Sequence, residues 1–83
     1  MDIELKYVVT EHGDFAIFTK LSNHSDVARG LHGRPVGAGF CNIRQKADSE
    51  DVNVHCYGRS VSLNLASRPE DEEMINKKIN FNY

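Results

Sequence analysis

The sequence lacks any apolar stretch long enough to cross a membrane. A transmembrane helix needs about 18 or more consecutive apolar residues, and no segment of the 83 residues approaches that length. The N-terminus carries Asp2 and Glu4 where a signal peptide has basic residues followed by an apolar run. We therefore expect a cytoplasmic location and no membrane partner.

Cysteine is scarce, with only Cys41 and Cys56. Two cysteines are too few for a disulfide framework, and their spacing is not Cys-x-x-Cys. The pattern predicts two small core residues, and the alternative is a redox pair on adjacent strands. A zinc site is disfavoured because His55 and Cys56 are neighbours on an expected strand and point to opposite faces. We expect no metal and no cofactor.

Motifs of catalysis are missing too. The sequence contains neither G-x-S-x-G nor a metallohydrolase pattern. Four histidines in 83 residues do not by their presence indicate a catalytic site. The expectation is therefore a protein that is not an enzyme.

Acidic residues are missing from one long interval. The formal net charge of -2 gives no field that would attract nucleic acid to the whole molecule. Between Asp26 and Asp48, however, the chain has no acid and several basic residues, namely Arg29, His32, Arg34, Arg44 and Lys46. This interval also contains four of the six glycines.

Glycines let successive backbone N–H groups converge on an anion, and arginine forks suit phosphate or carboxylate. The segment 29–46 is therefore a candidate anion-binding or nucleic-acid-binding site. Its candidate residues are Arg29, His32, Arg34 and Arg44, with Phe40 and Tyr57 as stacking platforms. The alternative is a flexible connection that leads into a strand relieved by glycine.

Alternating apolar residues predict a hairpin at the start of the chain. Residues 3–9 have the period of a half-buried strand, and residues 14–21 form the second run. We predict a two-residue turn at His12-Gly13. This turn places Val9 opposite Ala16 and Tyr7 opposite Phe18.

The middle of the chain is less regular at first. Residues 22–35 form either a short helix capped by Ser25 or an irregular loop. A strand is predicted over residues 36–45, entered through Gly37 and Gly39, where a bulge or a close backbone approach is expected.

Two further strands are predicted over residues 52–57 and 61–65, joined by a tight turn at Gly58-Arg59. The expected opposed pairs are Cys41 with Cys56, Ile43 with Val54, Phe40 with Tyr57 and Cys56 with Val61. One face of these strands is then apolar and the other is polar with two aromatic residues.

The C-terminal part predicts an amphipathic helix. Ser67-Arg68-Pro69-Glu70 is typical of a helix start, with Ser67 as the cap and Glu70 reaching back. Apolar residues then follow at helical spacing. The predicted fold is a single α+β domain over residues 1–83, in which this helix packs on one face of a five-stranded, mainly antiparallel sheet.

These observations favour a small non-enzymatic module that binds a protein partner or a second copy of itself. The polar sheet face and an edge strand are the two candidate surfaces. The alternative function is an anion or nucleic-acid binder that uses the segment 29–46. A catalytic or redox role for Cys41 or Cys56 is the third hypothesis.

Overall fold

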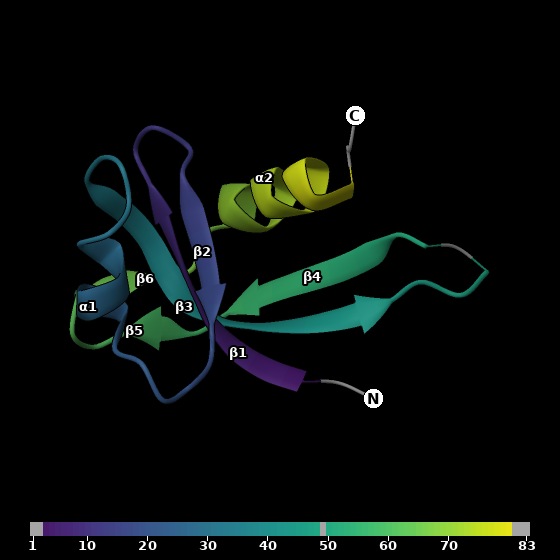
Figure 1. Cartoon of the computed structure of the whole chain (residues 1–83), viewed down its shortest axis with the longest axis horizontal. Helices are drawn as coiled ribbons and strands as arrows, with labels where there is room; N and C mark the ends of the chain where they lie inside the picture. Colours follow the sequence, from purple (N-terminus) through teal and green to yellow (C-terminus); the bar gives the residue numbers. More distant parts are fainter. Residues whose placement is uncertain (1–2, 49, 81–83) are drawn as a thin grey trace.

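Two antiparallel sheets and two helices make up the part of the chain that the structure describes. This structure is a computed structural model, and it describes residues 3–48 and 50–80. The elements in chain order are β1 (Ile3–Thr10), β2 (Phe15–Phe18), α1 (His24–Ala28), β3 (Pro35–Gln45), β4 (Val52–Tyr57), β5 (Arg59–Ser60), β6 (Leu65–Ala66) and α2 (Pro69–Asn80). The larger sheet has the order β2-β1-β3-β4, and β5 and β6 form a separate two-stranded sheet (Figure 1). The class is α+β, and no described helix is long and apolar enough to span a membrane.

The loop between β1 and β2 has three residues instead of the two predicted. The N–H of Thr10 donates to the carbonyl of Asp14 at 2.8 Å, which closes the loop around residues 11–13. Gly13 ends this loop with a φ of 80°, a conformation that glycine adopts at little cost. A three-residue hairpin loop commonly ends in such a left-handed residue.

The additional loop residue shifts the register of the hairpin by one position. The observed pairs are Tyr7 with Ile17 and Val9 with Phe15, where Tyr7 with Phe18 and Val9 with Ala16 were predicted. The predicted register was therefore wrong. Because the shift moves every β2 side chain to the opposite face, Phe15 and Ile17 share the face of Tyr7 and Val9.

Both Gly37 and Gly39 of β3 are closely approached. At Gly39 the neighbour is backbone, as predicted, whereas at Gly37 it is the side chain of Asp71. A Cβ at Gly37 would lie 2.0 Å from Oδ2 of Asp71, and a Cβ at Gly39 would lie 2.6 Å from the carbonyl oxygen of Tyr57. Real Cβ atoms are not found at such distances. The missing side chains therefore admit the start of α2 at one position and the end of β4 at the other.

The predicted strand over residues 61–65 is wrong, and the main sheet has four strands instead of five. After β4 the chain turns at Gly58, with a φ of 76°, and leaves the sheet. Residues 61–64 form a turn in which Ser60 Oγ accepts the N–H of Leu63 at 3.2 Å. The side chain of Val61 is 89% exposed and does not face Cys56.

The segment 22–35 contains a short helix, α1, so the helical alternative is the one observed. Asn23 occupies the N-cap position that was predicted for Ser25, and it makes no capping bond with its side chain. Helix α2 also begins differently in detail. Asp71, and not Glu70, reaches back and accepts the N–H of Arg68 through Oδ2 at 3.1 Å.

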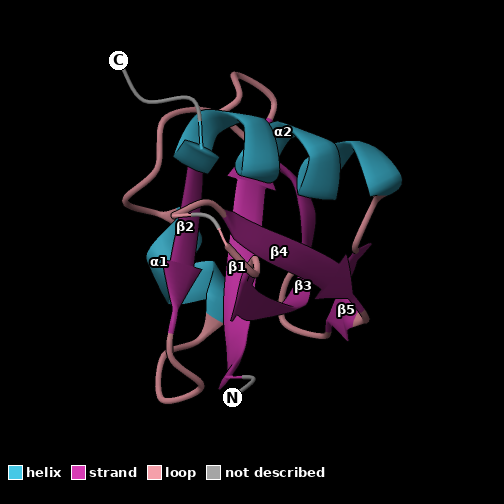
Figure 2. Cartoon of the chain, turned by 90° about the vertical axis from the view of Figure 1, so that its right-hand side faces the viewer, coloured by secondary structure: helices cyan, strands magenta, loops and turns pink. Residues whose placement is uncertain are grey.

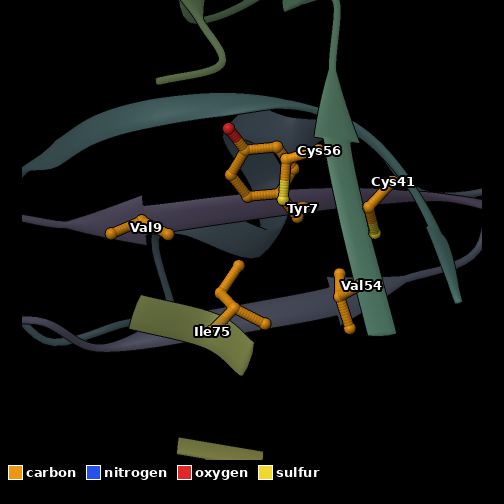
Figure 3. Packing of buried hydrophobic residues seen from close by; sticks show 6 residues of the cluster. All are labelled: Tyr7, Val9, Cys41, Val54, Cys56 and Ile75. Atoms are coloured by element: carbon orange, nitrogen blue, oxygen red, sulfur yellow. The ribbon is translucent and has the colours of Figure 1, made fainter. Parts of the chain in front are cut away.

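Both faces of the main sheet are packed (Figure 2). Between the sheet and α2 lies a core of Tyr7, Val9, Cys41, Val54, Cys56 and Ile75 (Figure 3). On the opposite face, Val8, Ala28 and Ala38 form a smaller core with Phe18, Leu31, Leu63 and Leu65 around it. This second core is a partial third layer that the sequence pattern did not predict. This layer covers only part of the sheet face, because α1, β5 and β6 are short elements.

Candidate functional site

The outer edge of β4 is closed by side chains of α2. The bonded pairs are Glu72 with Cys56, Asn76 with Val54 and Asn80 with Val52. Asn76 accepts the N–H of Val54 at 2.7 Å and donates to its carbonyl at 2.8 Å. Asn80 makes the same two bonds to Val52, at 2.9 Å and 2.8 Å. Each asparagine amide therefore takes the place of a peptide group of a neighbouring strand.

This ladder is possible because the helix and the strand have matching repeats. Four residues of a helix rise about 6 Å, and two residues of a strand rise about 6.6 Å. Glu72, Asn76 and Asn80 are spaced four apart, and their partners on β4 are spaced two apart. The match holds over two helical turns, so the N–H groups of all three β4 residues and the carbonyls of Val52 and Val54 are bonded without another strand.

The opposite edge of the sheet, along β2, is open. In an antiparallel ladder the backbone groups of alternate residues point to alternate sides. Since Thr10 bonds to Asp14, the residues of β2 that point outward are Phe15 and Ile17. The N–H of Phe15 is taken by Oδ1 of Asp14 at 3.1 Å. Within the described residues, nothing bonds to the outward N–H and carbonyl of Ile17.

Charged residues border β2 at both ends. Asp14 precedes the strand, and its Oδ2 accepts the N–H of His32 at 2.9 Å. Lys20 follows the strand, and its Nζ lies 2.7 Å from Oε1 of Glu4. The next residue, Leu21, is 97% exposed. The open edge therefore combines opposite charges at its ends with an exposed apolar side chain.

A row of aromatic rings crosses the sheet face that α2 does not cover. Phe40 and Tyr57 are opposed on β3 and β4, as predicted, and their ring centroids are 6.1 Å apart with an angle of 26°. His55 continues the row, 5.8 Å from Tyr57 with an angle of 22°. At the other end His24 of α1 meets Phe40 edge-on at 6.0 Å. Three nearly parallel rings therefore stand side by side on this face.

Two hollows lie at the two ends of this row. One of about 190 Å³ is lined by Asn42, Arg44, Asn53 and His55. The other, of about 360 Å³, has Lys6, Phe40, Arg59 and Val61 among its lining residues. Among the described residues that line either hollow, none is acidic.

Two carboxylates of the described residues lie near the row, and both are engaged. Oε1 of Glu72 lies 3.0 Å from Nδ1 of His55 and also accepts the N–H of Cys56. The Tyr57 hydroxyl donates to Oε2 of Glu4, and this hydrogen bond raises the pKa of Tyr57 to about 12. The bonds from Lys20 and then from Tyr57 hold the pKa of Glu4 below its usual value. Glu4 is therefore ionised at neutral pH and shared between two donors.

The structure divides the six predicted site residues into two groups. Phe40, Arg44 and Tyr57 share the open face. The other three residues line neither hollow: Arg34 immediately precedes β3, at the end of the strand away from Arg44, and Arg29 and His32 follow α1. The structure therefore brings three of the six residues together on one face and places the other three elsewhere.

The second group is occupied by local contacts. Arg29 lies 3.6 Å from Asp26, and Arg34 lies 3.8 Å from Glu11. The ring of His32 lies 5.3 Å from the ring of His12. Arg34 and His32 therefore contact the β1–β2 loop, whereas Arg29 pairs with a residue of α1.

The site residues predicted from the sequence did not include His55, Lys6 or Arg59. The strand pattern could have indicated His55, because this residue lies two positions before Tyr57 and therefore shares its face of the sheet. Lys6 is placed beside Phe40 by the β1–β3 pairing. Arg59 reaches the hollow only because the chain leaves the sheet after β4, which no local pattern indicated.

A buried ionic cluster holds the start of α2 against the sheet. Asp71 is fully buried, and its Oδ2 accepts the hydroxyl of Tyr7 at 2.8 Å. Its Oδ1 accepts Nε and Nη2 of Arg68 at 2.9 and 2.6 Å. Burial and then the bond to Asp71 raise the pKa of Tyr7. A cleft of about 430 Å³ opens beside this cluster, but the Asp71 carboxylate is already satisfied.

The two cysteines lie in the core, as predicted. Cys41 and Cys56 are opposed on β3 and β4, and both are buried with free thiols. Burial raises the pKa of Cys41 to about 11 and that of Cys56 to about 12. Both thiols are therefore protonated at neutral pH, which makes them poor nucleophiles.

Comparisons with protein-family models, with curated proteins and with solved structures gave no match. Within residues 3–48 and 50–80, no group of three or more His, Cys, Asp or Glu side chains could hold a metal ion. Two surfaces of the described residues are therefore candidates for binding, the open edge of β2 and the aromatic row.

Proposed function

We propose that this protein is a small binding module that associates with a second copy of itself through the open edge of β2. One observation carries the proposal. The described residues close the β4 edge with three side chains of α2, whereas they leave the outward backbone groups of Ile17 without a partner. An open edge strand is a template for pairing with another strand.

The charges at the ends of β2 favour a second copy as the occupant. Outward-pointing residues must face outward-pointing residues in the added strand, which restricts the register. Antiparallel pairing centred on Ile17 places Asp14 of one copy opposite Lys20 of the other, twice by symmetry. The residue at the centre of this pairing is the apolar Ile17 in both copies. Each face of one sheet then continues into the corresponding face of the other sheet.

The contact would be small, because one pair of short strands buries less than the roughly 1,200 Å² of a standard stable interface. The exposed Leu21 lies just beyond Lys20 and adds apolar area near the loop of the other copy. We therefore expect a reversible dimer with a dissociation constant in the micromolar to millimolar range.

Sedimentation velocity over a wide concentration range measures this equilibrium. Thr19→Pro removes an outward N–H at the edge, a position at which proline is tolerated in a monomer, and is expected to abolish dimerisation. Lys20→Glu places like charges opposite each other and is expected to weaken the dimer by about three- to tenfold. Lys77→Glu makes the same charge change on α2 and serves as the control.

A chain that stays monomeric at millimolar concentration would overturn the proposal. A dimer that Thr19→Pro leaves unchanged would do so as well, because the interface would then lie elsewhere. Urea unfolding of each variant shows whether a loss of dimer comes from the edge or from loss of the fold.

A further inference from the structure

The sheet face with the aromatic row has no role in the dimer, because it lies on a different surface from the edge of β2. The row consists of Phe40, Tyr57 and His55, and it ends in a hollow at each side. Tyr57, the middle ring, lines neither hollow, whereas each outer ring lines one. A further flat ring could therefore be added in the hollow beside His55, and in the hollow beside Phe40, where His24 meets Phe40 edge-on.

Positive charge accompanies each of these ends. Arg44 lines the hollow beside His55, and Lys6 and Arg59 line the hollow beside Phe40. Lys6 donates to the carbonyl of Ser22 at 2.9 Å, and Arg59 donates to the side chain of Asn64 at 3.0 Å. Neither bond neutralises the cation, since both acceptors are uncharged. Of the carboxylates near the row, Glu4 is shared between Lys20 and Tyr57, and Glu72 lies against Nδ1 of His55 and accepts the N–H of Cys56.

Flat rings flanked by cations on an open sheet suit unpaired bases joined by phosphates. Bases stack on aromatic side chains irrespective of sequence, and cations contact the phosphates. An antiparallel sheet that exposes aromatic rings can bind single strands, whereas a duplex hides its base faces. We propose that this face binds single-stranded nucleic acid, with one base in each hollow against His55 or Phe40.

This surface contains only some of the six residues that the sequence predicted for a nucleic-acid site. Phe40, Arg44 and Tyr57 remain in the surface, and His55, Lys6 and Arg59 join them. Arg29 and Arg34 lie outside the surface, because neither lines a hollow and each is paired with a carboxylate, that of Asp26 and that of Glu11. This division provides a matched test, because each group offers two arginines with exposed side chains for the same substitution.

Fluorescence anisotropy with a short, labelled single-stranded RNA of mixed sequence tests the surface at low and at physiological salt. The double variant Arg44→Gln with Arg59→Gln is expected to lower affinity by roughly tenfold and to reduce the salt dependence. The matched control, Arg29→Gln with Arg34→Gln, makes the same charge change and is expected to keep the parent affinity.

His55→Ala tests stacking separately from charge. The side chain of His55 is exposed, so the fold is expected to survive, and affinity is expected to fall about fivefold or more. The salt dependence should remain that of the parent protein, because the His55 ring is placed to stack on a base while its Nδ1 faces Oε1 of Glu72 at 3.0 Å.

Three further results would overturn the proposal. These are no binding at low salt, an equal loss of affinity in the control double variant, and binding of duplex RNA as tight as that of the single strand. A free nucleoside monophosphate that binds as tightly as the oligonucleotide would assign the hollows to a small molecule instead. Urea unfolding of all variants confirms that changes in affinity do not come from unfolding.

Discussion

At the scale of single residues, a glycine and a buried carboxylate depend on each other. Asp71 can enter the sheet face because Gly37 has no side chain, and its carboxylate is then held by Tyr7 and Arg68. Breaking a buried charged network by altering one member is costly because the remaining groups lose their partners. Position 37 is therefore constrained by residues that are distant in the sequence.

Gly37→Ala is expected to lower the free energy of unfolding by about 1–3 kcal/mol, since either β3 or Asp71 has to move. Urea unfolding followed by circular dichroism measures this change. Gly30→Ala is the control, because its Cβ would make an ordinary contact of 3.5 Å with the carbonyl of Val27. A loss of stability in Gly30→Ala equal to that in Gly37→Ala would contradict the explanation.

His24 is a second residue whose effect can be tested alone. Its Nε2 lies 2.7 Å from the carbonyl oxygen of Gly39, and burial lowers its pKa below 6.5. The unfolded chain therefore takes up this proton at a higher pH than the folded chain does. The contribution of neutral His24 to the free energy of unfolding is fully present above about pH 6.5. It is lost as the pH falls through the pKa of His24 in the folded state.

Urea unfolding at a series of pH values from neutral downward is expected to show this loss. His24→Gln should make the profile flatter just below neutral pH, because the titrating ring is gone. His32→Gln, at an exposed histidine, should keep the parent profile. A His24→Gln profile as steep as that of the parent would assign the pH dependence to other groups.

At the scale of elements, α2 both fills the core and closes a sheet edge. Ile75 is buried in the core, and the neighbouring row of Glu72, Asn76 and Asn80 binds the backbone of β4. The closed edge also explains why no fifth strand follows β4, since its outward groups already have partners. The chain therefore leaves the sheet and forms β5 and β6 instead.

Asn76→Ala is expected to lower the free energy of unfolding by about 1–2 kcal/mol, because it leaves the N–H and carbonyl of Val54 without partners. Lys77→Ala, at the next and exposed position of the same helix, should change stability little. Equilibrium unfolding in urea distinguishes the two. Equal values for both variants would mean that water replaces the asparagine without cost.

The local elements were largely predictable. The pairing of Cys41 with Cys56 and Ile43 with Val54 follows from alternation together with the loop over residues 46–51. Alternation decides which faces meet, and the position of the loop selects among registers that differ by two residues. The register of the first hairpin was not predictable in this way. Both faces of β2 carry apolar residues, so the pattern accepts either register, and the loop length decides between them.

At the scale of the whole molecule, the proposed dimer and the proposed nucleic-acid surface are compatible. Pairing at β2 joins two four-stranded sheets and keeps corresponding faces on the same side. Both aromatic rows then face the same direction. The uncovered face remains accessible in each copy because the contact involves the edge only.

The sequence by itself determined the class of the fold, most of the strands and the C-terminal helix, because these depend on periodicity and turn residues that act over a few positions. Only the tertiary structure decided which sheet edge is closed and which basic residues share a face with Phe40. Arg34 and Arg44 are both near β3 in the sequence, but an extended strand carries them far apart. Glu72 and Cys56 are 16 positions apart, and the packing of α2 brings them into contact.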